Sequence, residues 1–404
     1  WNQLKLQKDT MVHLIRFLYG LTLAFLFLIF VPIWYVLNKK KGYDVGLLER
    51  LVLKVKDLQT RPVWIHCAST GELKTAMPII NYISSKEEVL ITVFSPRSYD
   101  FALKNLKNTV VVFLPFDFGF LIKRFIKHYK PKILIIEEAE FWFNLVYVSS
   151  KSIPVLSINT KIPKNVENLY YRTLLKRFSK FILRNQKDAE VLKKIVEEEK
   201  ITVCGNLKLL SQVKEKNIDL DKNGKKIILA GSTHNPEEKV ILEVFLLLKQ
   251  SFPDLSLVLA PRHTERVDEI VEIVKKHNLS YSLRSKTNKI DTDVYIVDTL
   301  GELAYMYRFA DAIFIGGTIA NVGGHNIFEA ILSGKKVIIG NNYHKIKDLV
   351  EEAEKLNAIF IVKDKNQLKE AILKVLNNPN LEIDIRKIQS DIYECYKKEV
   401  DRWI

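Results

Sequence analysis

The chain has 404 residues, and its 62 lysines and arginines exceed its 47 aspartates and glutamates by 15, a basic excess that favours an anionic partner. Hydrophobic residues make up 48% and charged residues 27%, which excludes extensive disorder and provides apolar material for two cores. The cysteines Cys67, Cys204 and Cys395 lie far apart without a CxxC spacing, which excludes a disulfide scaffold and a cysteine-rich zinc site and indicates a reducing compartment.

The N-terminal part of the chain contains an uncharged run over residues 17–37. A helix of this length spans roughly 32 Å, enough to cross the hydrocarbon core of a bilayer. Trp34 and Tyr35 lie near one end and Lys39–Lys41 follow, so the positive-inside rule places the rest of the chain in the cytoplasm. We therefore predict a single N-terminal membrane anchor. A cleaved signal peptide is disfavoured because no small-residue cleavage site precedes the lysines, whereas Pro32 leaves a monotopic insertion as an alternative.

Short apolar runs then alternate with amphipathic helical patterns. Runs of this length and composition predict buried strands, here over 63–66, 89–95, 109–115, 132–137 and 155–159. Helical patterns over 73–83 and 120–129 lie between them. The stretch 203–226 is polar and is the best linker candidate.

The same alternation resumes after the linker. Strands are predicted over 226–232, 255–261, 294–298, 312–318 and 336–340, with helices over 236–250, 265–277, 301–309, 326–333 and 345–355. Two series of strand–helix repeats predict an α/β fold with two Rossmann-like, doubly wound parallel sheets. We divide the chain into an N-terminal segment with the anchor (1–41), an N-terminal domain (42–212) and a C-terminal domain (213–404) whose last helix is free to cross back. A cleft lined by strand carboxyl ends is the expected ligand site.

The loop after the first predicted strand contains Ser69-Thr70-Gly71-Glu72, and its spacing is compatible with two functions of the glutamate. In a capping box, Ser69 is the N-cap of the next helix and Glu72 is its N3 residue. As a general base, Glu72 lies at the mouth of the cleft and deprotonates an acceptor hydroxyl. The helix N-terminus is expected to lower the pKa of Glu72.

Three carboxylates, Glu137, Glu138 and Glu140, follow the predicted strand 132–137. They either favour the N-terminus of a helix or stabilise positive charge that develops on a sugar ring. Lys208 lies in the short sequence CGNLK, and by itself it is an ordinary surface lysine. Its position near the predicted domain junction makes it a candidate for the site.

Polar loops follow four successive strands of the C-terminal half. Residues 231–238 place Pro236 near the start of a helix, an arrangement that suits phosphate. Arg262 and His263 end the next strand, where a guanidinium can hold a phosphate. Residues 298–302, after the third strand, have a Thr-x-x-Glu capping pattern. After the fourth strand, two Gly-Gly pairs in residues 316–330 let backbone N–H groups approach a ligand closely. Together these loops indicate a nucleotide site.

No metal site is predicted. Asp291 and Asp293 match the DxD string of metal-dependent glycosyltransferases, but they precede a strand of another architecture and are interpreted as a solvated turn. No spacing of His, Asp and Glu indicates a metal site, and no nucleophile elbow or P-loop motif is present. No cofactor is expected. RNA- and DNA-binding signatures are also missing, so nucleic acid is not expected as a partner.

Seven motifs resemble, in order, those of the Kdo (3-deoxy-D-manno-octulosonate) transferases of lipopolysaccharide synthesis. The resemblance covers about residues 44–390 and rests on HCASTGE, EEAEFW, GNLK, STHNPEE, PRHTER, DTLGEL and GGHNIFEA. It implies a GT-B fold and an inverting, metal-independent transfer of Kdo from CMP-Kdo to lipid IVA. An N-terminal membrane anchor also belongs to this family.

The resemblance assigns roles to individual residues. Glu72 is implied to be the base that deprotonates the acceptor hydroxyl, and Glu138 and Lys208 are implied to stabilise the transition state. CMP is implied to bind Pro261, Arg262, Leu300, Gly301, Glu302, Asn326, Ile327, Phe328 and Glu329. The implied partners are CMP-Kdo, lipid IVA and an anionic membrane surface, and the implied location is the cytoplasmic side of the cell inner membrane.

Two positions depart from the family pattern. Phe143 replaces a proline, and Lys161 replaces an arginine in a short motif after the next strand. Both belong to the acceptor side, so the resemblance leaves the acceptor details and the number of Kdo residues added undefined.

Two other functions remain as alternatives. The first is another GT-B sugar-nucleotide enzyme, either a UDP-sugar transferase or an epimerase, although the motifs HCASTGE and EEAE disfavour it. The second is a basic membrane-tethered binding protein without catalysis, in which Glu72 serves only as a helix cap.

Overall fold

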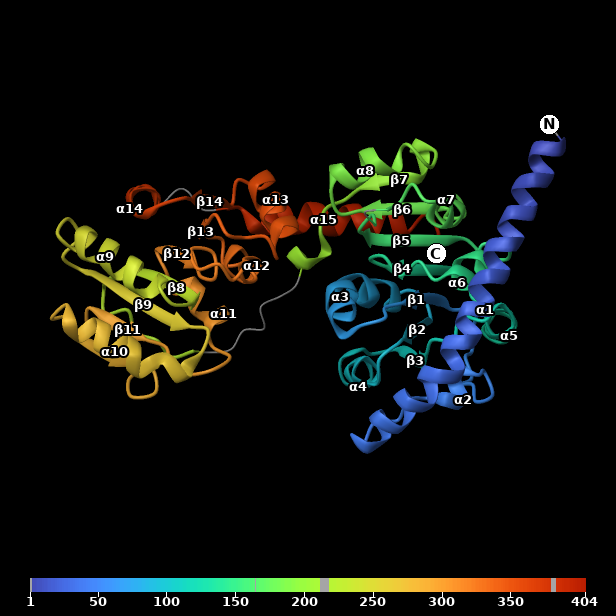
Figure 1. Ribbon diagram of the computed structural model, residues 1–404, viewed down its shortest axis with the longest axis horizontal. Coiled ribbons are helices and arrows are strands. Elements are labelled where there is room, and N and C mark those ends of the chain that lie inside the picture. The colour runs from blue at the N-terminus through green and yellow to red at the C-terminus, as the bar shows by residue number, and fades with distance from the viewer. Residues whose placement is uncertain (1, 164, 211–217, 379–382) are drawn as a thin grey trace. The chain divides into compact units, whose positions relative to one another are not determined.

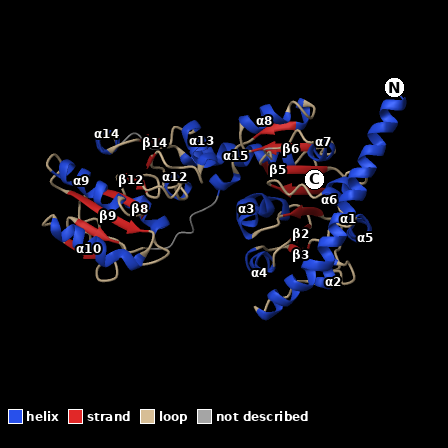
Figure 2. Cartoon of the chain, viewed as in Figure 1, coloured by secondary structure: helices blue, strands red, loops and turns tan. Residues whose placement is uncertain are grey.

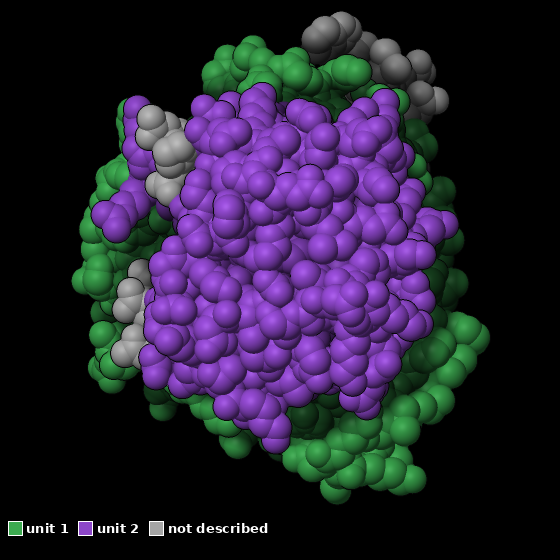
Figure 3. All heavy atoms as spheres, turned by 90° about the vertical axis from the view of Figure 1, so that its left-hand side faces the viewer, with its two compact units in different colours: residues 1–211, 389–404 green, residues 212–388 purple. Residues whose placement is uncertain are grey.

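The computed structural model describes residues 2–163, 165–210, 218–378 and 383–404, apart from the side chains of residues 2–10 and His13. The chain divides into two compact units (Figure 3). Unit 1 consists of residues 1–211 and 389–404, and unit 2 of residues 212–388. Each unit contains its own parallel sheet with helices around it (Figures 1 and 2).

Unit 1 contains a seven-stranded sheet in the order β3-β2-β1-β4-β5-β6-β7, in which every pair is parallel. The strands are β1 (Val63–His66), β2 (Val89–Val93), β3 (Thr109–Phe113), β4 (Ile133–Glu137), β5 (Val155–Thr160), β6 (Lys180–Leu183) and β7 (Ile201–Val203). The helices are α1 (Asn2–Lys40), α2 (Leu47–Arg50), α3 (Thr70–Ser84), α4 (Pro96–Asn105), α5 (Gly119–Tyr129), α6 (Phe143–Ser149), α7 (Leu169–Leu175), α8 (Gln186–Leu192) and α15 (Ile385–Val400), with short 3₁₀ helices η1 (Glu198–Lys200) and η2 (Leu207–Leu210). Helix α15 begins in unit 2 and belongs to unit 1 from residue 389 onward.

Unit 2 also contains a seven-stranded parallel sheet, with the strand order β10-β11-β9-β8-β12-β13-β14. Its strands are β8 (Lys226–Thr233), β9 (Leu255–Pro261), β10 (Tyr281–Leu283), β11 (Val294–Ile296), β12 (Ala312–Ile315), β13 (Val337–Gly340) and β14 (Ile359–Val362). Its helices are α9 (Glu237–Lys249), α10 (Val267–Lys276), α11 (Leu303–Met306), α12 (Phe328–Ile331), α13 (Lys347–Lys355) and α14 (Lys365–Asn377), with η3 (Thr264–Arg266) and η4 (Tyr307–Phe309).

The central strands are largely apolar and buried because helices cover both faces of each sheet. All residues of β1, β2, β4 and β9 are buried. The predicted pair of doubly wound parallel sheets is confirmed. The prediction missed β6, β7, β10 and β14. These strands lie toward the edges of the sheets and are three or four residues long, and all but β6 are mostly only partly buried.

Polar residues in left-handed backbone conformations occur at the carboxyl ends of three central strands. Glu138 directly follows β4 and Asn159 lies in β5, with φ angles of 55° and 50°. Ser232 lies near the end of β8 with a φ of 54°. Such conformations cost about 1–3 kcal/mol for residues with a side chain and are typical of functional sites. Candidate active-site residues are therefore expected at the carboxyl ends of both sheets.

Candidate active site

Glu72 of unit 1 forms the predicted capping box. Ser69 is the N-cap of α3, and its Oγ accepts a hydrogen bond from the Glu72 N–H at 3.2 Å. In return, Glu72 Oε1 accepts from Ser69 Oγ at 2.8 Å and Oε2 accepts from the Ala68 N–H at 2.7 Å. Each carboxylate oxygen has a further lone pair, because an ionised carboxylate has about four acceptor positions. The cap therefore fixes Glu72 without using all of its capacity to accept a proton.

The pKa of Glu72 is raised to about 7, in contrast to the expected lowering by the helix N-terminus. Partial burial is the main cause, because it disfavours the charged form, and the negative charges of Glu140 and Glu138 add to it. The hydrogen bonds from Ser69 and Ala68 act in the opposite direction but are outweighed. A carboxyl group with a pKa near neutrality is well matched to general-base catalysis.

The three carboxylates after β4 have separate partners. Glu137 is buried and accepts from Asn159 Nδ2 at 3.0 Å, and burial raises its pKa well above the ordinary value. Glu138 forms an ion pair with Lys208 Nζ at 3.2 Å, and Glu140 accepts from the indole N–H of Trp142 at 2.6 Å. Helix α6 begins only at Phe143, without acidic residues in its first turn. The alternative in which these carboxylates favour a helix N-terminus is therefore wrong.

The loop that carries Lys208 is held from two sides. The amide of Leu207 donates to Asn159 Oδ1 at 3.1 Å, and the amide of Lys208 donates to Asn206 Oδ1 at 2.9 Å. From the other side, Tyr396 of α15 donates its hydroxyl to the carbonyl of Gly205 at 3.0 Å. The structure therefore brings Glu72, Glu138 and Lys208 to the carboxyl edge of one sheet, and Glu138 and Lys208 into direct contact.

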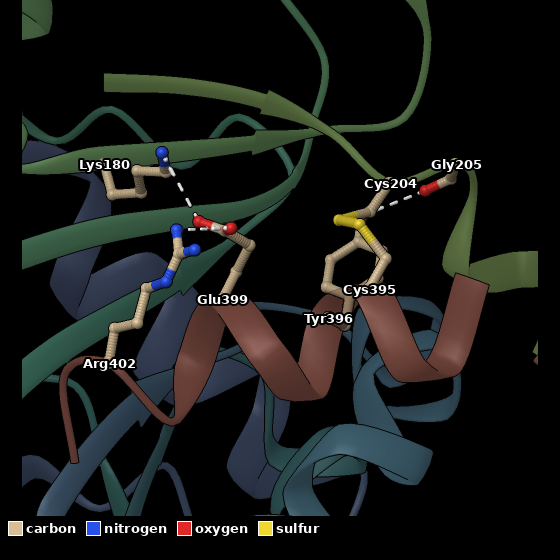
Figure 4. The surroundings of a disulfide bond; sticks show 7 residues. All are labelled: Lys180, Cys204, Gly205, Cys395, Tyr396, Glu399 and Arg402. Carbon is tan, nitrogen blue, oxygen red and sulfur yellow. Dashed lines mark hydrogen bonds and ion pairs between the residues drawn. A yellow bond between two sulfur atoms is a disulfide. The ribbon is translucent and has the colours of Figure 1, made fainter. Parts of the chain in front are cut away.

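Cys204, directly before this loop, forms a disulfide with Cys395 of α15 (Figure 4). This pairing departs from the expectation of reduced cysteines, which rested on their wide spacing in the sequence. The two residues are 191 positions apart, and only the return of α15 to unit 1 makes them neighbours. On the same helix, Glu399 forms an ion pair with Lys180 at 3.3 Å and with Arg402 at 2.7 Å. The disulfide and these ion pairs fix α15 against β6 and the Lys208 loop.

Cys395→Ser is expected to lower the unfolding free energy of unit 1 by about 2–4 kcal/mol, the typical contribution of a disulfide. Melting curves recorded with and without dithiothreitol measure this effect. The reductant should lower the melting temperature of the wild type and leave that of Cys395→Ser unchanged. If the reductant shifts both proteins equally, the disulfide does not stabilise unit 1.

In unit 2, the predicted nucleotide-binding residues lie at the carboxyl ends of β9 and β11 and at the start of α12. Arg262 directly follows β9, and its amide donates to the carbonyl of Thr233 at 3.0 Å. Leu300 is 79% exposed and precedes Gly301, which has a φ of 79°. Glu302 accepts from Arg284 Nε at 3.0 Å. The predicted helix over 301–309 begins at Leu303, and Thr299 bonds to the Glu302 carboxylate instead of capping the helix.

The segment at the start of α12 combines exposed and buried residues. Asn326 and Glu329 are exposed, and Asn326 Nδ2 donates to Glu329 Oε1 at 3.3 Å. Asn326 Oδ1 also accepts from the amide of Phe328 at 3.0 Å. In contrast, the side chains of Ile327 and Phe328 are buried in the core of unit 2. These two residues can therefore contact a nucleotide only through their backbones.

The amide groups from Gly317 to Ala320, which begin in the first Gly-Gly pair, are occupied by a protein carboxylate. Glu237 at the start of α9 is fully buried, and its two oxygens accept from the amides of Gly317, Thr318, Ile319 and Ala320 at 2.8–3.1 Å. The amide of His234 donates to the same carboxylate at 2.9 Å. The expectation that this part of the loop offers its N–H groups to a ligand is wrong, because Glu237 uses them to hold the loop in place.

A pair of histidines that no sequence pattern indicated joins two of these loops. The Nε2 atoms of His234 and His325 are 2.8 Å apart, and their rings are stacked with centroids 5.0 Å apart. His263 lies nearby, with its ring centroid 5.6 Å from that of His234. Burial lowers the pKa of His325 to about 4. With His325 neutral, one Nε2 donates to the other across this contact.

Asp293 of the DxD string has a structural role. Its carboxylate pairs with Lys249 at 2.8 Å and accepts from Ser280 Oγ at 2.7 Å. Within the part of the chain that the structure describes, no group of three or more His, Cys, Asp or Glu side chains is placed to hold a metal ion.

Comparison with known proteins identifies the family. Residues 46–211 match the family described as 3-deoxy-D-manno-octulosonic-acid transferase (kdotransferase), and residues 211–390 match glycosyl transferases group 1. The 3-deoxy-D-manno-octulosonic acid transferase of Aquifex aeolicus is 34% identical over 85% of this chain and 93% of its own length. The corresponding protein of Haemophilus influenzae is 28% identical over 78% and 79%.

The chain belongs to the Kdo transferase family. It is therefore a glycosyltransferase that transfers Kdo. Among solved structures, UDP-GlcNAc 2-epimerase from Neisseria meningitidis bound to UDP-GlcNAc has a TM-score of 0.55 and 14% identity over 83% of this chain and 96% of that one. At this identity the likeness shows the fold alone, which is GT-B, as the sequence resemblance implied.

The departure from the family pattern at Phe143 has a structural context. Phe143 is fully buried, and its ring lies 5.5 Å from that of Tyr19 on α1 and 5.6 Å from that of Tyr147. A proline at this position would lack the aromatic surface for these contacts. Phe143 thus belongs to the surface of unit 1 on which α1 packs. Lys161 is exposed directly after β5.

Proposed function

We propose that this Kdo transferase moves Kdo from CMP-Kdo to lipid IVA with inversion at the anomeric carbon, on the cytoplasmic side of the bacterial inner membrane, in lipopolysaccharide biosynthesis. The observation that carries the proposal is Glu72, a half-buried carboxylate with a pKa of about 7 that a capping box holds beside the Glu138–Lys208 ion pair. Family membership and the seven shared motifs support the donor and the acceptor.

In the proposed reaction, Glu72 accepts the proton of the acceptor hydroxyl while the oxygen of that hydroxyl attacks the anomeric carbon of Kdo. The bond between that carbon and the phosphate oxygen of CMP breaks, and CMP leaves with the electron pair. The proton that Glu72 takes up is later released to solvent. Because the leaving group is already anionic, it needs neutralising charge more than a proton.

The remaining residues have supporting roles in this proposal. Glu138 stabilises positive charge that develops on the sugar ring, and Lys208 holds the Glu138 carboxylate in place at 3.2 Å. Arg262 neutralises the phosphate of CMP, a role for which an exposed guanidinium is suited. The exposed carboxylate of Glu329 binds the ribose hydroxyls, and Pro261, Leu300–Glu302 and the backbone of residues 326–328 contact the rest of the nucleotide.

Incubation of the membrane-bound enzyme with CMP-Kdo and lipid IVA tests the proposal. Mass spectrometry of the lipid should show the addition of whole Kdo residues, and the number of CMP molecules released should equal the number of residues added. The number of mass steps also gives the number of Kdo units transferred. Transfer from a UDP-sugar without CMP release would contradict the proposal.

The pH dependence of the reaction provides a second prediction. A general base must be ionised, so the rate at subsaturating CMP-Kdo should rise with pH up to about 7, the pKa of Glu72, and then level off. Below this pH the rate should fall roughly tenfold per pH unit. A pH profile of kcat/KM in the wild type and in Glu72→Gln measures the effect. The acidic limb should be missing in the variant; if both proteins show it, another group titrates.

A further inference from the structure

Helix α1 packs against the rest of unit 1 along one continuous face. Within this helix, half-buried positions recur at intervals of three or four residues, which is the spacing of a single helical face. They are residues 12, 15, 16, 19, 20, 23, 24, 27, 31, 34, 35 and 38. In Figure 1, α1 runs along unit 1 beside α5 and α6.

Specific contacts fix the start, the middle and the end of this face. Tyr19 donates its hydroxyl to the buried carboxylate of Asp117 at 2.7 Å, and Arg16 Nε donates to Asn144 Oδ1 at 3.3 Å. The ring of Phe27 lies 4.8 Å from that of Phe116 and 5.6 Å from that of Phe118. Near the other end, the buried guanidinium of Arg50 lies over the ring of Trp34. At about 1.5 Å per residue, the contacts from Arg16 to Trp34 cover roughly 27 Å of helix.

The opposite face of α1 is apolar and exposed. Phe17, Leu21, Phe25, Leu28 and Phe30 are exposed by 67%, 61%, 65%, 74% and 58%, respectively. No charged residue interrupts the face between Phe17 and Leu37. Soluble proteins rarely expose contiguous apolar patches of more than a few hundred Å², and larger patches mark protein or membrane interfaces.

A transbilayer orientation of α1 conflicts with the contacts of its packed face. The hydrocarbon core of a bilayer is about 30 Å thick, nearly the length over which α1 contacts unit 1. If α1 crossed the bilayer, the adjoining surface of unit 1, with the Asp117 carboxylate and the exposed Lys123, Arg124 and Lys127 of α5, would enter the hydrocarbon. Polar groups and irregular backbone in contact with lipid are strongly unfavourable there.

We propose that α1 lies in the plane of the membrane as a monotopic surface, with its exposed apolar face in the acyl region of one leaflet of an anionic bilayer. Two observations favour lipid as the occupant. Lys39, Lys40 and Lys41 follow the apolar run and are exposed, where they can meet anionic headgroups. Phe120 at the start of α5 is 67% exposed and its ring is stacked against that of Phe118, which extends the apolar surface beyond α1.

The topology of α1 in sealed membranes tests the proposal. Thr10→Cys and Lys41→Cys introduce thiols at either end of the apolar run in the full chain, while Cys67 is buried and Cys204 and Cys395 are bonded to each other. A membrane-impermeant maleimide should label both new thiols in inside-out vesicles and neither in intact spheroplasts. Labelling of the two positions from opposite sides would establish a spanning helix and overturn the proposal.

Binding to vesicles of phosphatidylethanolamine and phosphatidylglycerol provides the second test. The double variant Phe25→Glu/Leu28→Glu should bind at least tenfold more weakly than the wild type. Leu103→Glu on α4, where the leucine is 54% exposed, is the matched control and should bind like the wild type. Equal binding of all three proteins would overturn the proposal. The proposal would also be overturned if the wild type did not bind the vesicles and formed a dimer in analytical ultracentrifugation, while the double variant stayed monomeric. In that case a second copy of the chain would cover the apolar face.

Discussion

Glu72→Gln is expected to lower the turnover of Kdo transfer at least about a hundredfold and to leave the affinity for CMP unchanged, because the variant lacks the group that accepts the acceptor proton. The side-chain carbonyl of glutamine can still accept a hydrogen bond from the Ala68 amide, so the start of α3 should stay intact. Single-turnover kinetics with lipid IVA measure the chemical step, and calorimetric titration with CMP measures the affinity.

Ser69→Ala is the matched control for this prediction, because it weakens the same capping box without removing the carboxylate. The loss of an N-cap costs about 1 kcal/mol of stability, and the variant should keep its turnover within about tenfold of the wild type. If Ser69→Ala and Glu72→Gln lower turnover equally, Glu72 acts only as a cap. Equal losses of turnover and CMP affinity in Glu72→Gln would also contradict its role as the base.

Glu237→Gln is expected to lower the unfolding free energy of unit 2 by at least about 3 kcal/mol, because hydrogen bonds to a charged acceptor contribute about 1.5–3 kcal/mol each. The glutamine amide would turn a donor toward amides that are themselves donors, in a fully buried position. The loop from Gly317 to Ala320 should then lose its fixed conformation. Since the candidate nucleotide residues from Asn326 onward follow this loop, CMP affinity should fall at least tenfold.

Glu238→Gln provides the control at the neighbouring position of α9. Glu238 is also buried, but its partner is Arg266 at 2.9 Å and not the glycine-rich loop. This variant should lose stability while its folded form keeps the CMP affinity of the wild type. Urea denaturation followed by fluorescence measures stability, and calorimetry well below the melting temperature measures affinity. If the two variants bind CMP equally, Glu237 does not position the nucleotide loop.

The architecture was largely predictable from the sequence because buried parallel strands are continuous apolar runs. The predicted bounds of β1 and β9 match the structure, and those of β2, β4 and β13 differ by one or two residues. The capping box of Ser69 and Glu72 was also predictable, because it depends on residues three positions apart. Short edge strands such as β10 were missed because their few apolar residues resemble those of loops.

The direction of the pKa shift of Glu72 could not be predicted from the residues near it in the sequence. A helix N-terminus lowers the pKa of a carboxyl group, and the sequence near Glu72 contains only that signal. Burial and the charges of Glu140 and Glu138, some seventy positions away, reverse the direction. The hydrogen bonds of Glu237 with the Gly317–Ala320 amides likewise join residues that are at least eighty positions apart in the sequence.

The two parallel sheets, the apolar N-terminal run and the family could be recognised from the amino-acid sequence, because each depends on patterns within short segments. Four features became visible only in the folded chain: the pKa of Glu72, the availability of the loop amides, the Cys204–Cys395 disulfide and the packing of α1 through Tyr19 and Phe27. All four have the same cause. Desolvation, hydrogen-bond pairing, disulfide formation and helix docking depend on which residues become neighbours in space, and these neighbours are far apart along the chain.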